Sequence, residues 1–403
     1  MREFSDDERR RRLLVRHRLT AATRAATPEE ATEAVGVLHS TEPATVYLSV
    51  RVRAPHLGVD DVDRALHRDR TLVKQLAMRR TLFVFPRALL PAAWGSAAAR
   101  VAATERAGLV KGVESSGLAT DGAAWVEERR AEIVAAVAAT PSGLTAVEVR
   151  EAVPGAAVQV SVPGGVVPAH TRLLTHLGLT ADLVRGENTQ HWRLSRPRWA
   201  PMESWLGAEP VATTSAQGYA ELVRTWLERF APGTEEDLVW WLGATKGAVR
   251  AALTEVGAVA VQLEDGGPAW VLPGDEETHE DPGPEPHVAL LPVLDPTVMG
   301  WRGRDWYLEP ALAARLFDRN GNAGTTAWVD GRAVGCWVQG ADGVVHVAVE
   351  PSAEVSPAAR AALQHEAEQL GEWLDGERVG TVYPSPAMKD AREQLGEAQV
   401  TRG

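Results

Sequence analysis

Two residues, His39 and Thr41, have side-chain types and a spacing that suit the hydrolysis of a bond. A neutral imidazole can accept a proton from water, and a nearby hydroxyl group can orient that water. The same two residues also have a structural interpretation, in which His39 packs against its neighbours and Thr41 caps a helix. Both interpretations need a corner in the backbone that brings the two side chains to one side.

The flanking sequence predicts such a corner. Thr27-Pro28-Glu29-Glu30 has the N-cap, the first-turn proline and the capping box of a helix start, and we expect this helix to end near Leu38. Glu42-Pro43 opens a second helix, because proline is tolerated at the first helical position and not deeper. His39 and Thr41 are therefore expected in the corner between two helices.

Composition excludes several classes of protein. No apolar run approaches the ~20 residues that span a bilayer, and the N-terminus lacks the apolar segment of a signal peptide. We therefore expect a cytoplasmic protein that does not enter a membrane. Cys336 is the only cysteine, and the 11 histidines do not fall at metal-ligand spacing. Walker and dinucleotide-binding motifs are absent as well, so we predict neither a metal nor a cofactor.

Charge is distributed unevenly along the 403 residues. The formal net charge is −12, but residues 1–200 carry 28 Lys and Arg against 22 Asp and Glu, a balance of +6. Residues 201–403 carry 14 against 32, a balance of −18. Almost all of the basic residues in the first half are arginines, which suit phosphate recognition. Either this half meets a polyanion such as nucleic acid, or surface charge simply differs between domains.

Three stretches of the sequence repeat the order of helices followed by a hairpin. The first hairpin surrounds Met78-Arg79-Arg80-Thr81, the second stretch has a capping box from Thr145 to Glu148, and the third hairpin has an acidic tip at 264–267. Helices followed by a hairpin are typical of a winged helix. We therefore predict an α+β fold with three tandem winged-helix domains and a strand-rich C-terminal region that has a closing helix. The predicted domains are 1–115, 116–205, 206–273 and 274–403.

Other segments give local predictions. Residues 6–24 favour an arginine-rich helix, which is either a phosphate-contacting arm or a solvated helix. The Gly-, Val- and Pro-rich residues 153–167 predict a loop, and the acidic residues 273–287 predict a linker between domains. Asp330-Gly331 predicts a two-residue hairpin turn, and residues 357–374 predict the closing helix.

If the basic half binds DNA, its arginines near the corner and on the first two hairpins are the expected phosphate contacts. The third hairpin is acidic, so we expect the third domain to be mainly structural, with a smaller contribution from its helix. The predicted DNA-binding residues are Arg51, Arg53, Arg79, Arg80, Arg185, Arg193, Lys246, Arg250 and Arg302.

Several motifs resemble one family. The segment Leu38-His-Ser-Thr-Glu-Pro-Ala-Thr-Val-Tyr-Leu-Ser49 is similar to the Leu-Gln-Ala-Gln-Asp-Pro-x-x-x-Tyr-Leu segment of the AlkZ-like DNA glycosylases, bacterial tandem winged-helix proteins. Residues 78–86, 290–296 with 300–302, and 329–335 match further pieces in the same order. The family's catalytic signature is Gln-x-Gln or Gln-x-Asp, and His39-Ser40-Thr41 stands in its place here.

The resemblance implies a DNA glycosylase that removes bulky N7-alkylated purines, with interstrand crosslinks as a further class of substrate and self-resistance to a genotoxic natural product as one setting. Its partner would be double-stranded DNA carrying alkylated purines, and we expect a monomer. His39 and Thr41 are then the catalytic residues. No lysine lies in the segment, so a monofunctional enzyme is expected. Two alternatives stay open: a non-catalytic winged-helix DNA-binding protein, and a protein whose winged helices mediate protein contacts.

Overall fold

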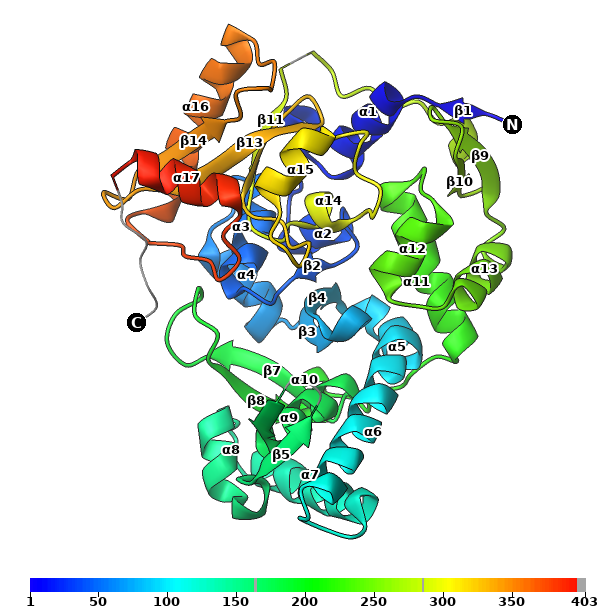
Figure 1. Cartoon of the computed structure of the whole chain (residues 1–403), viewed down its shortest axis with the longest axis vertical. Coiled ribbons are helices and arrows are strands. Elements are labelled where there is room, and N and C mark those ends of the chain that lie inside the picture. The colour runs from blue at the N-terminus through cyan, green and yellow to red at the C-terminus, as the bar shows by residue number, and fades with distance from the viewer. Residues whose placement is uncertain (163–164, 285, 397–403) are drawn as a thin grey trace. The chain divides into compact units, whose positions relative to one another are not determined.

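The structure is a computed structural model that describes residues 1–162, 165–284 and 286–396. It combines helices and strands throughout, in agreement with the predicted α+β class (Figure 1). Within these ranges, no helix is both long enough and apolar enough to cross a membrane.

The chain forms two compact units. Unit 2 is the continuous segment 63–222, whereas unit 1 combines residues 1–62 with residues 223–403. The chain passes between the units within two helices, α4 (Val59–Asp63) and α11 (Ser215–Phe230). Unit 1 thus gathers parts of the first, third and fourth predicted domains. The division into four domains stays a prediction, because the two units group the chain at a coarser level.

Unit 2 contains six complete α-helices and three hairpins in its described part. Its elements are β3 (Leu72–Leu76), β4 (Leu82–Pro86), α5 (Leu90–Ala93), α6 (Ala99–Ser115), α7 (Gly122–Ala138), α8 (Ala146–Ala152), β5 (Gln159–Val162), β6 (Gly165–Pro168), α9 (Ala169–Leu179), β7 (Leu183–Asn188), β8 (Pro197–Pro201) and α10 (Met202–Leu206). α6, α7 and α9 enclose a core that includes Ile133, Leu177 and Trp199. The predicted hairpin at 71–86 is confirmed, since β3 and β4 pair antiparallel from Leu72 to Leu76.

Two predictions within unit 2 were wrong. The loop predicted at 153–167 contains the hairpin β5–β6, in which Val160 pairs with Val167. Val160 is buried while its neighbours Gln159 and Ser161 are exposed, and this alternation is hidden in the sequence by glycine and proline. For the second stretch, residues 183–193 predict two strands about a polar tip, but this hairpin is longer: β7 is followed by β8, which begins only at Pro197.

The third helix-and-hairpin stretch has the predicted order. α11 is followed by α12 (Glu235–Leu242), α13 (Lys246–Glu255), β9 (Val259–Leu263) and β10 (Pro268–Val271). The capping box that opens α12 is present, with Thr234 and Asp237 bonding each other's backbone N–H groups. The sequence did not predict that the N-terminal strand β1 (Glu3–Phe4) joins this hairpin, parallel to β9.

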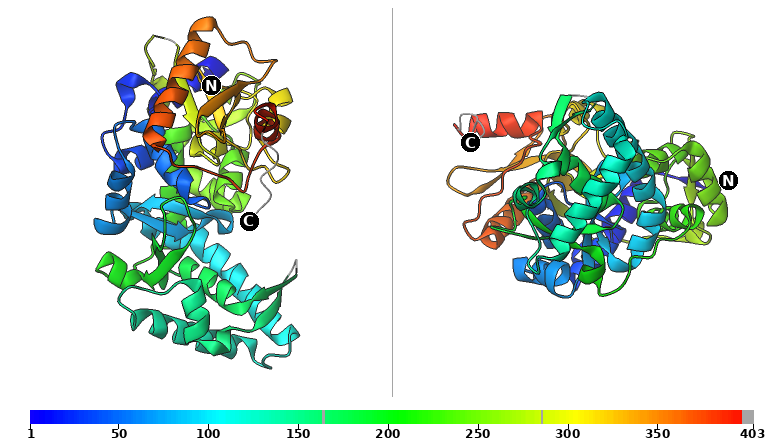
Figure 2. Two further views of the ribbon diagram at one scale, coloured as in Figure 1. Left: turned by 90° about the vertical axis from the view of Figure 1, so that its left-hand side faces the viewer. Right: turned by 90° about the horizontal axis from the view of Figure 1, so that it is seen from below.

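A four-stranded antiparallel sheet forms the C-terminal part of unit 1. Its strands, in spatial order, are β11 (Val288–Leu291), β12 (Thr326–Val329), β13 (Arg332–Gln339) and β14 (Val345–Val349). Asp330 and Gly331 form the predicted two-residue turn, with φ values of +47° and +77°. The predicted closing helix is α16 (Pro357–Leu374), which packs against β11 and β14 (Figure 2). A further helix, α17 (Pro386–Gln394), follows it and packs on β13.

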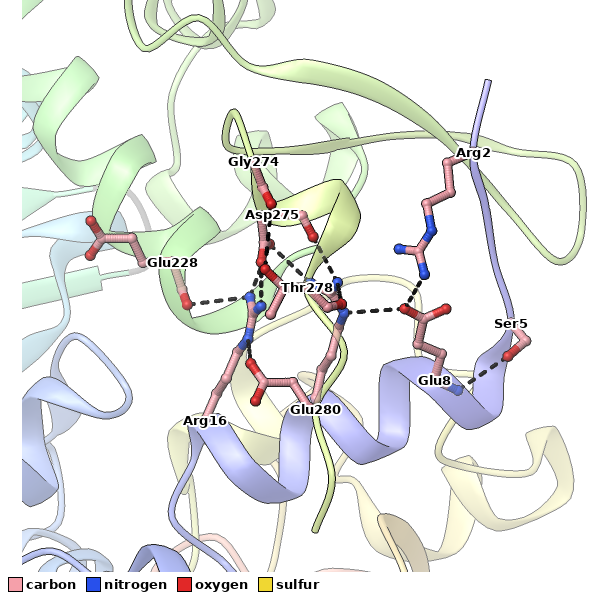
Figure 3. A network of polar contacts seen from close by, with 10 residues as sticks. Arg2, Ser5, Glu8, Arg16, Glu228, Gly274, Asp275, Thr278 and Glu280 are labelled. Carbon is pink, nitrogen blue, oxygen red and sulfur yellow. Dashed lines mark hydrogen bonds and ion pairs between the residues drawn. The ribbon is translucent and has the colours of Figure 1, made fainter.

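The N-terminal arginines have a role that neither sequence interpretation anticipated. Helix α1 (Asp6–Arg16) ends well before residue 24, and two of its arginines, Arg12 and Arg16, pair with the acidic segment 275–280. Figure 3 shows the contacts of Arg16. Arg12 Nη1 lies 3.0 Å from Asp275 Oδ2, and Arg16 reaches Asp275 at 2.5 Å and Glu280 at 3.2 Å. Buried charges are stable only when paired, so these arginines hold the acidic segment and are neither a phosphate-contacting arm nor a solvated face.

Candidate functional site

The candidate site lies where the chain turns from α2 (Pro28–Glu33) through the two-residue strand β2 (Leu38–His39) into α3 (Pro43–Arg53), all in unit 1. α2 has the predicted start, with the Thr27 hydroxyl accepting from the Glu30 N–H at 3.1 Å. It ends five residues before the predicted end at Leu38. Gly36 has a φ of +71°, a conformation that does not continue a helix and that glycine adopts easily.

His39 and Thr41 lie together in this corner. His39 is 7% exposed, whereas Thr41 is exposed to solvent. The Thr41 N–H points at Nδ1 of His39 across 3.5 Å, so Nδ1 is the accepting ring nitrogen in this contact. A hydrogen bond of this length is weak, and a water molecule can replace its donor.

The two other polar residues of the corner are enclosed. Ser40 is buried, and among the described residues its hydroxyl oxygen has no hydrogen-bond partner. Glu42 is the residue before α3, but its carboxylate does not cap that helix. Oε1 of Glu42 instead accepts from the Thr381 hydroxyl at 2.8 Å and from the Val382 N–H at 2.5 Å. Burial raises the pKa of Glu42 despite these two bonds.

Three polar side chains on one face of α3 hold the corner in place. Thr45, Ser49 and Arg53 are spaced four residues apart, so they project from the same side of the helix. The Thr45 hydroxyl donates to the Val293 carbonyl at 2.8 Å, and the Ser49 hydroxyl donates to Asp295 Oδ2 at 2.7 Å. The segment that follows β11 thereby fixes α3, and α3 fixes the position of Thr41 and His39.

Arg53 completes this face with a fully buried ion pair. Its two Nη atoms bond the two oxygens of Asp295 at 2.9 and 2.8 Å, and both residues have 0% side-chain exposure. Burial alone would raise the pKa of Asp295, but the charge and hydrogen bonds of Arg53, with the bond from Ser49, lower it below its ordinary value. The predicted contact between Arg53 and a DNA phosphate does not fit this burial.

Arg51 also lies in the interior of unit 1. Its side chain is 2% exposed and forms an ion pair with Glu366 of α16. The predicted phosphate contact of Arg51 therefore does not fit the structure either. The sequence could not reveal this, because α3 is buried on all sides and its polar side chains bond to other buried groups.

The predicted DNA contacts of unit 2 lie on its hairpins. Arg79 and Arg80 form the turn between β3 and β4, where both have positive φ values and exposed side chains. Arg80 also contacts Glu105 of α6 at 3.3 Å. Arg185 lies on β7, and Arg193 is partly buried in the connection between β7 and β8.

The remaining predicted contacts gather at the first turn of α12 in unit 1. Arg250 is 67% exposed and bonds both oxygens of Glu235, at 2.7 and 3.1 Å. Arg302 is 62% exposed and lies 3.5 Å from Glu236. Lys246 is exposed at the start of α13. The hydrogen bond from Arg250 and the charges of Arg250 and Lys246 lower the pKa of Glu235. Nearby carboxylates thus offset the positive charges on this face.

Sequence reasoning missed two basic residues of unit 2. Lys74 is buried in the middle of β3, and burial lowers its pKa to about 8. Arg196 lies at the end of the β7–β8 connection, where Arg193, Arg196 and Arg198 follow one another closely. That cluster was the available signal for Arg196, whereas nothing in the sequence marks Lys74 as buried. In the described ranges, no group of three or more His, Cys, Asp or Glu residues is arranged to hold a metal ion.

Comparison with known proteins identifies the family. The model of the family "DNA glycosylase AlkZ-like" matches residues 32–373. The solved structure of the Streptomyces sahachiroi DNA glycosylase AlkZ has a similar fold, with a TM-score of 0.71 at 18% sequence identity; the match covers 90% of this chain and 96% of that chain. No curated protein sequence matches the chain. Because the family model spans most of the sequence, including the His39–Thr41 corner, the chain belongs to the AlkZ-like DNA glycosylase family.

Proposed function

We propose that the protein hydrolyses the N-glycosidic bond of bulky N7-alkylated purines in double-stranded DNA, with His39 and Thr41 as its catalytic residues. The observation that carries the proposal is the corner itself: the exposed Thr41 lies beside a His39 ring whose Nδ1 faces the Thr41 N–H. Membership of the DNA glycosylase AlkZ-like family supports the class of reaction. The class of damaged base comes from the resemblance of residues 38–49 to the family's catalytic segment.

The proposed reaction needs a general base that accepts a proton from water, and it needs no general acid. Alkylation at N7 makes a purine cationic, so the base leaves readily when the bond between C1′ and N9 breaks and its electron pair moves onto N9. Water then forms a new bond to C1′, and its proton moves to Nδ1 of His39. The Thr41 hydroxyl orients this water. The products are the free alkylated base and an abasic site.

The main support for a catalytic role of His39 and Thr41 is the fixed position of the corner that holds them. The corner is fixed by the hydrogen bonds of Thr45 and Ser49 and by the anchoring of Glu42 at Thr381 and Val382. A water held between two fixed groups reacts faster than free water, because its orientation is set before the reaction. The segment 38–49 contains no lysine that could form a Schiff base, so we propose a monofunctional glycosylase.

The wider proposal follows from the same resemblance. The three helix-and-hairpin stretches would act as winged helices on the DNA, and interstrand crosslinks would be a second class of substrate. The protein would work as a cytoplasmic monomer without a cofactor, and self-resistance to a DNA-alkylating natural product would be its biological setting. The alternative is a winged-helix protein that binds DNA without excising a base, because the two glutamines of the family signature are absent.

Single-turnover release of an N7-alkylguanine adduct separates these functions. Removing a positioned base typically lowers a rate by roughly 10²–10⁴-fold, so we expect His39→Ala to approach background depurination while still binding DNA. Thr41→Val keeps the shape and removes the hydroxyl, so it should lose less. Excision by the parent should rise with pH as the imidazole loses its proton. If His39→Ala excises as fast as the parent, the corner is only a junction between helices; if the parent excises nothing, the binding alternative holds.

A further inference from the structure

Unit 2 contains a groove that the proposed reaction does not use. It has a volume of about 530 Å³ and lies between the start of α8, one side of α9 and the β7–β8 hairpin. We call it the hairpin groove. Its lining includes Arg185 and Arg196, and none of its lining residues is an aspartate or glutamate in the part of the chain that the structure describes. The groove is therefore positively charged without an internal counterion.

Arg185 is the central residue of the hairpin groove. Its guanidinium lies 5.1 Å from the centre of the Trp199 ring, and its Nε is enclosed without a hydrogen-bond partner among the described residues. Burial lowers the pKa of Arg185 to about 10, and no neighbouring carboxylate counteracts this effect. A buried charge is normally paired. The missing partner is thus an anion that does not belong to unit 2.

The nearby acidic residues do not supply that partner. Glu148 accepts from the Thr145 N–H in the capping box and forms an ion pair with Arg198 at 3.1 Å. Glu187 is exposed two residues after Arg185 and influences Lys74, but it does not affect the pKa of Arg185. Both carboxylates leave the Arg185 charge uncompensated.

The hairpin side of the groove adds further donors. Arg196, Ser195 and Thr189 are exposed, and within the described ranges their side chains make no hydrogen bond or ion pair. The threonines of α9 are different, because Thr171 and Thr175 already donate to the carbonyls of Pro168 and Thr171. Guanidinium groups and free hydroxyls together are the donor set that proteins use for phosphate oxygens.

We propose that the hairpin groove binds a phosphate of the DNA backbone, held by the guanidinium groups of Arg185 and Arg196. Stacking on Trp199 covers one face of the Arg185 guanidinium and leaves its edge for two parallel bonds to phosphate oxygens. The assignment rests on the proposed action on DNA. It goes further by giving unit 2 a specific phosphate site that is independent of the catalytic corner in unit 1.

Binding of undamaged duplex DNA at several salt concentrations tests the proposal. Arg185→Met preserves the contact with Trp199 and removes the charge, so it should weaken binding about tenfold and reduce the slope of log affinity against log salt by about 1. Arg185→Lys keeps the charge and should retain the slope. Arg150, an exposed arginine of α8 outside the groove, provides the matched control: Arg150→Gln should change neither quantity.

Thermal unfolding of the same variants separates binding from structure. Removing an unpaired buried charge stabilises a fold, so Arg185→Met should have a higher melting temperature than the parent together with weaker DNA binding. A lower melting temperature, unchanged DNA binding, or an equal loss in Arg150→Gln would each overturn the proposal. If Arg185→Met does not fold, Arg196→Gln decides, and an unchanged salt slope in that variant overturns it.

Inorganic phosphate distinguishes the two possible sources of the anion. If millimolar phosphate stabilises the parent against heat while Arg185→Met binds DNA normally, the groove takes a free anion and the DNA assignment is wrong. All of these measurements use undamaged duplex and do not depend on base excision. If the parent excises the adduct and Arg185→Met binds DNA as tightly as the parent, only the groove proposal is wrong. If the parent excises nothing, the result on DNA binding by the groove is still valid.

Discussion

At the scale of single residues, burial decides what each charged group can do. Arg53 and Arg185 have the same side chain, but both Nη atoms of Arg53 donate to the carboxylate of Asp295. The guanidinium of Arg185 instead lies over the ring of Trp199. The first arrangement completes a core, and the second leaves a charge for a ligand. Sequence alone treats both as candidate phosphate contacts, because neither the partner of Arg53 nor the missing partner of Arg185 is local.

Lys74 allows the energetic consequence of burial to be measured. Its pKa is about 8 in the folded protein against an ordinary 10.5, mainly because of burial, with a further lowering by the charge of Arg185. Below pH 8 the ammonium is charged in both states and destabilises the fold; above 10.5 it is neutral in both states and the effect disappears. Lys74→Met should therefore increase the free energy of unfolding by about 1–3 kcal/mol at pH 7.

This stabilisation should shrink as pH rises from 8 to 10.5, and chemical denaturation of the parent and Lys74→Met at several pH values measures it. Lys111, which lies on the partly exposed face of α6, provides a control. Lys111→Met should change stability by less than about 0.5 kcal/mol at every pH. A Lys74→Met protein that is less stable than the parent at pH 7 would show that the ammonium is paired in the folded state.

At the scale of elements, local signals were reliable and distant pairings were not. The capping box from Thr145 to Glu148 predicted a helix start, because both bonding groups lie within four residues of one another. The corner of His39 and Thr41 was predicted for the same reason. In contrast, the bonds from Arg16 to Asp275 span 259 residues, and no feature near Arg16 identifies its partner.

The buried face of α3 gives the prediction at this scale. Arg53→Met leaves Asp295 charged and unpaired inside unit 1, so it should lower the free energy of unfolding by about 3–5 kcal/mol at pH 7. The pKa of Asp295 lies below its ordinary value, so the pair stabilises the fold above that ordinary value and loses this effect as pH falls through the lowered pKa. Urea denaturation of the parent and the variant between pH 3 and 7 measures both effects.

Arg250→Met is the matched control, since its pair with Glu235 is exposed to solvent and should contribute little to stability. Adding Asp295→Asn to Arg53→Met removes the unpaired charge and should restore part of the lost stability. If Arg53→Met and Arg250→Met cost the same, the α3 face does not depend on its ion pair, and another contact must hold the corner.

At the scale of the whole molecule, the two compact units differ in net charge, although less than the two sequence halves do. Unit 2 contains 18 Lys and Arg against 15 Asp and Glu, a balance of +3, whereas unit 1 contains 24 against 39, a balance of −15. Two of the arginines that made the first half basic, Arg12 and Arg16, lie in α1 of unit 1 and are paired with residues 275–280. The sequence could show the surplus of arginine, but only the fold shows which arginines are already neutralised.

This division predicts where DNA affinity resides. Arg79 and Arg80 project from the β3–β4 turn of the basic unit, whereas Lys246 and Arg250 lie beside Glu235 in the acidic unit. Each lost phosphate contact lowers the salt slope of binding by about 0.9. Arg79→Ala/Arg80→Ala should therefore weaken duplex binding and flatten its salt dependence by up to about 2, and Lys246→Ala/Arg250→Ala should lose less at equal salt. Fluorescence anisotropy with one duplex at four salt concentrations compares the two variants, and a larger loss in the second would make α13 the main DNA-contacting helix.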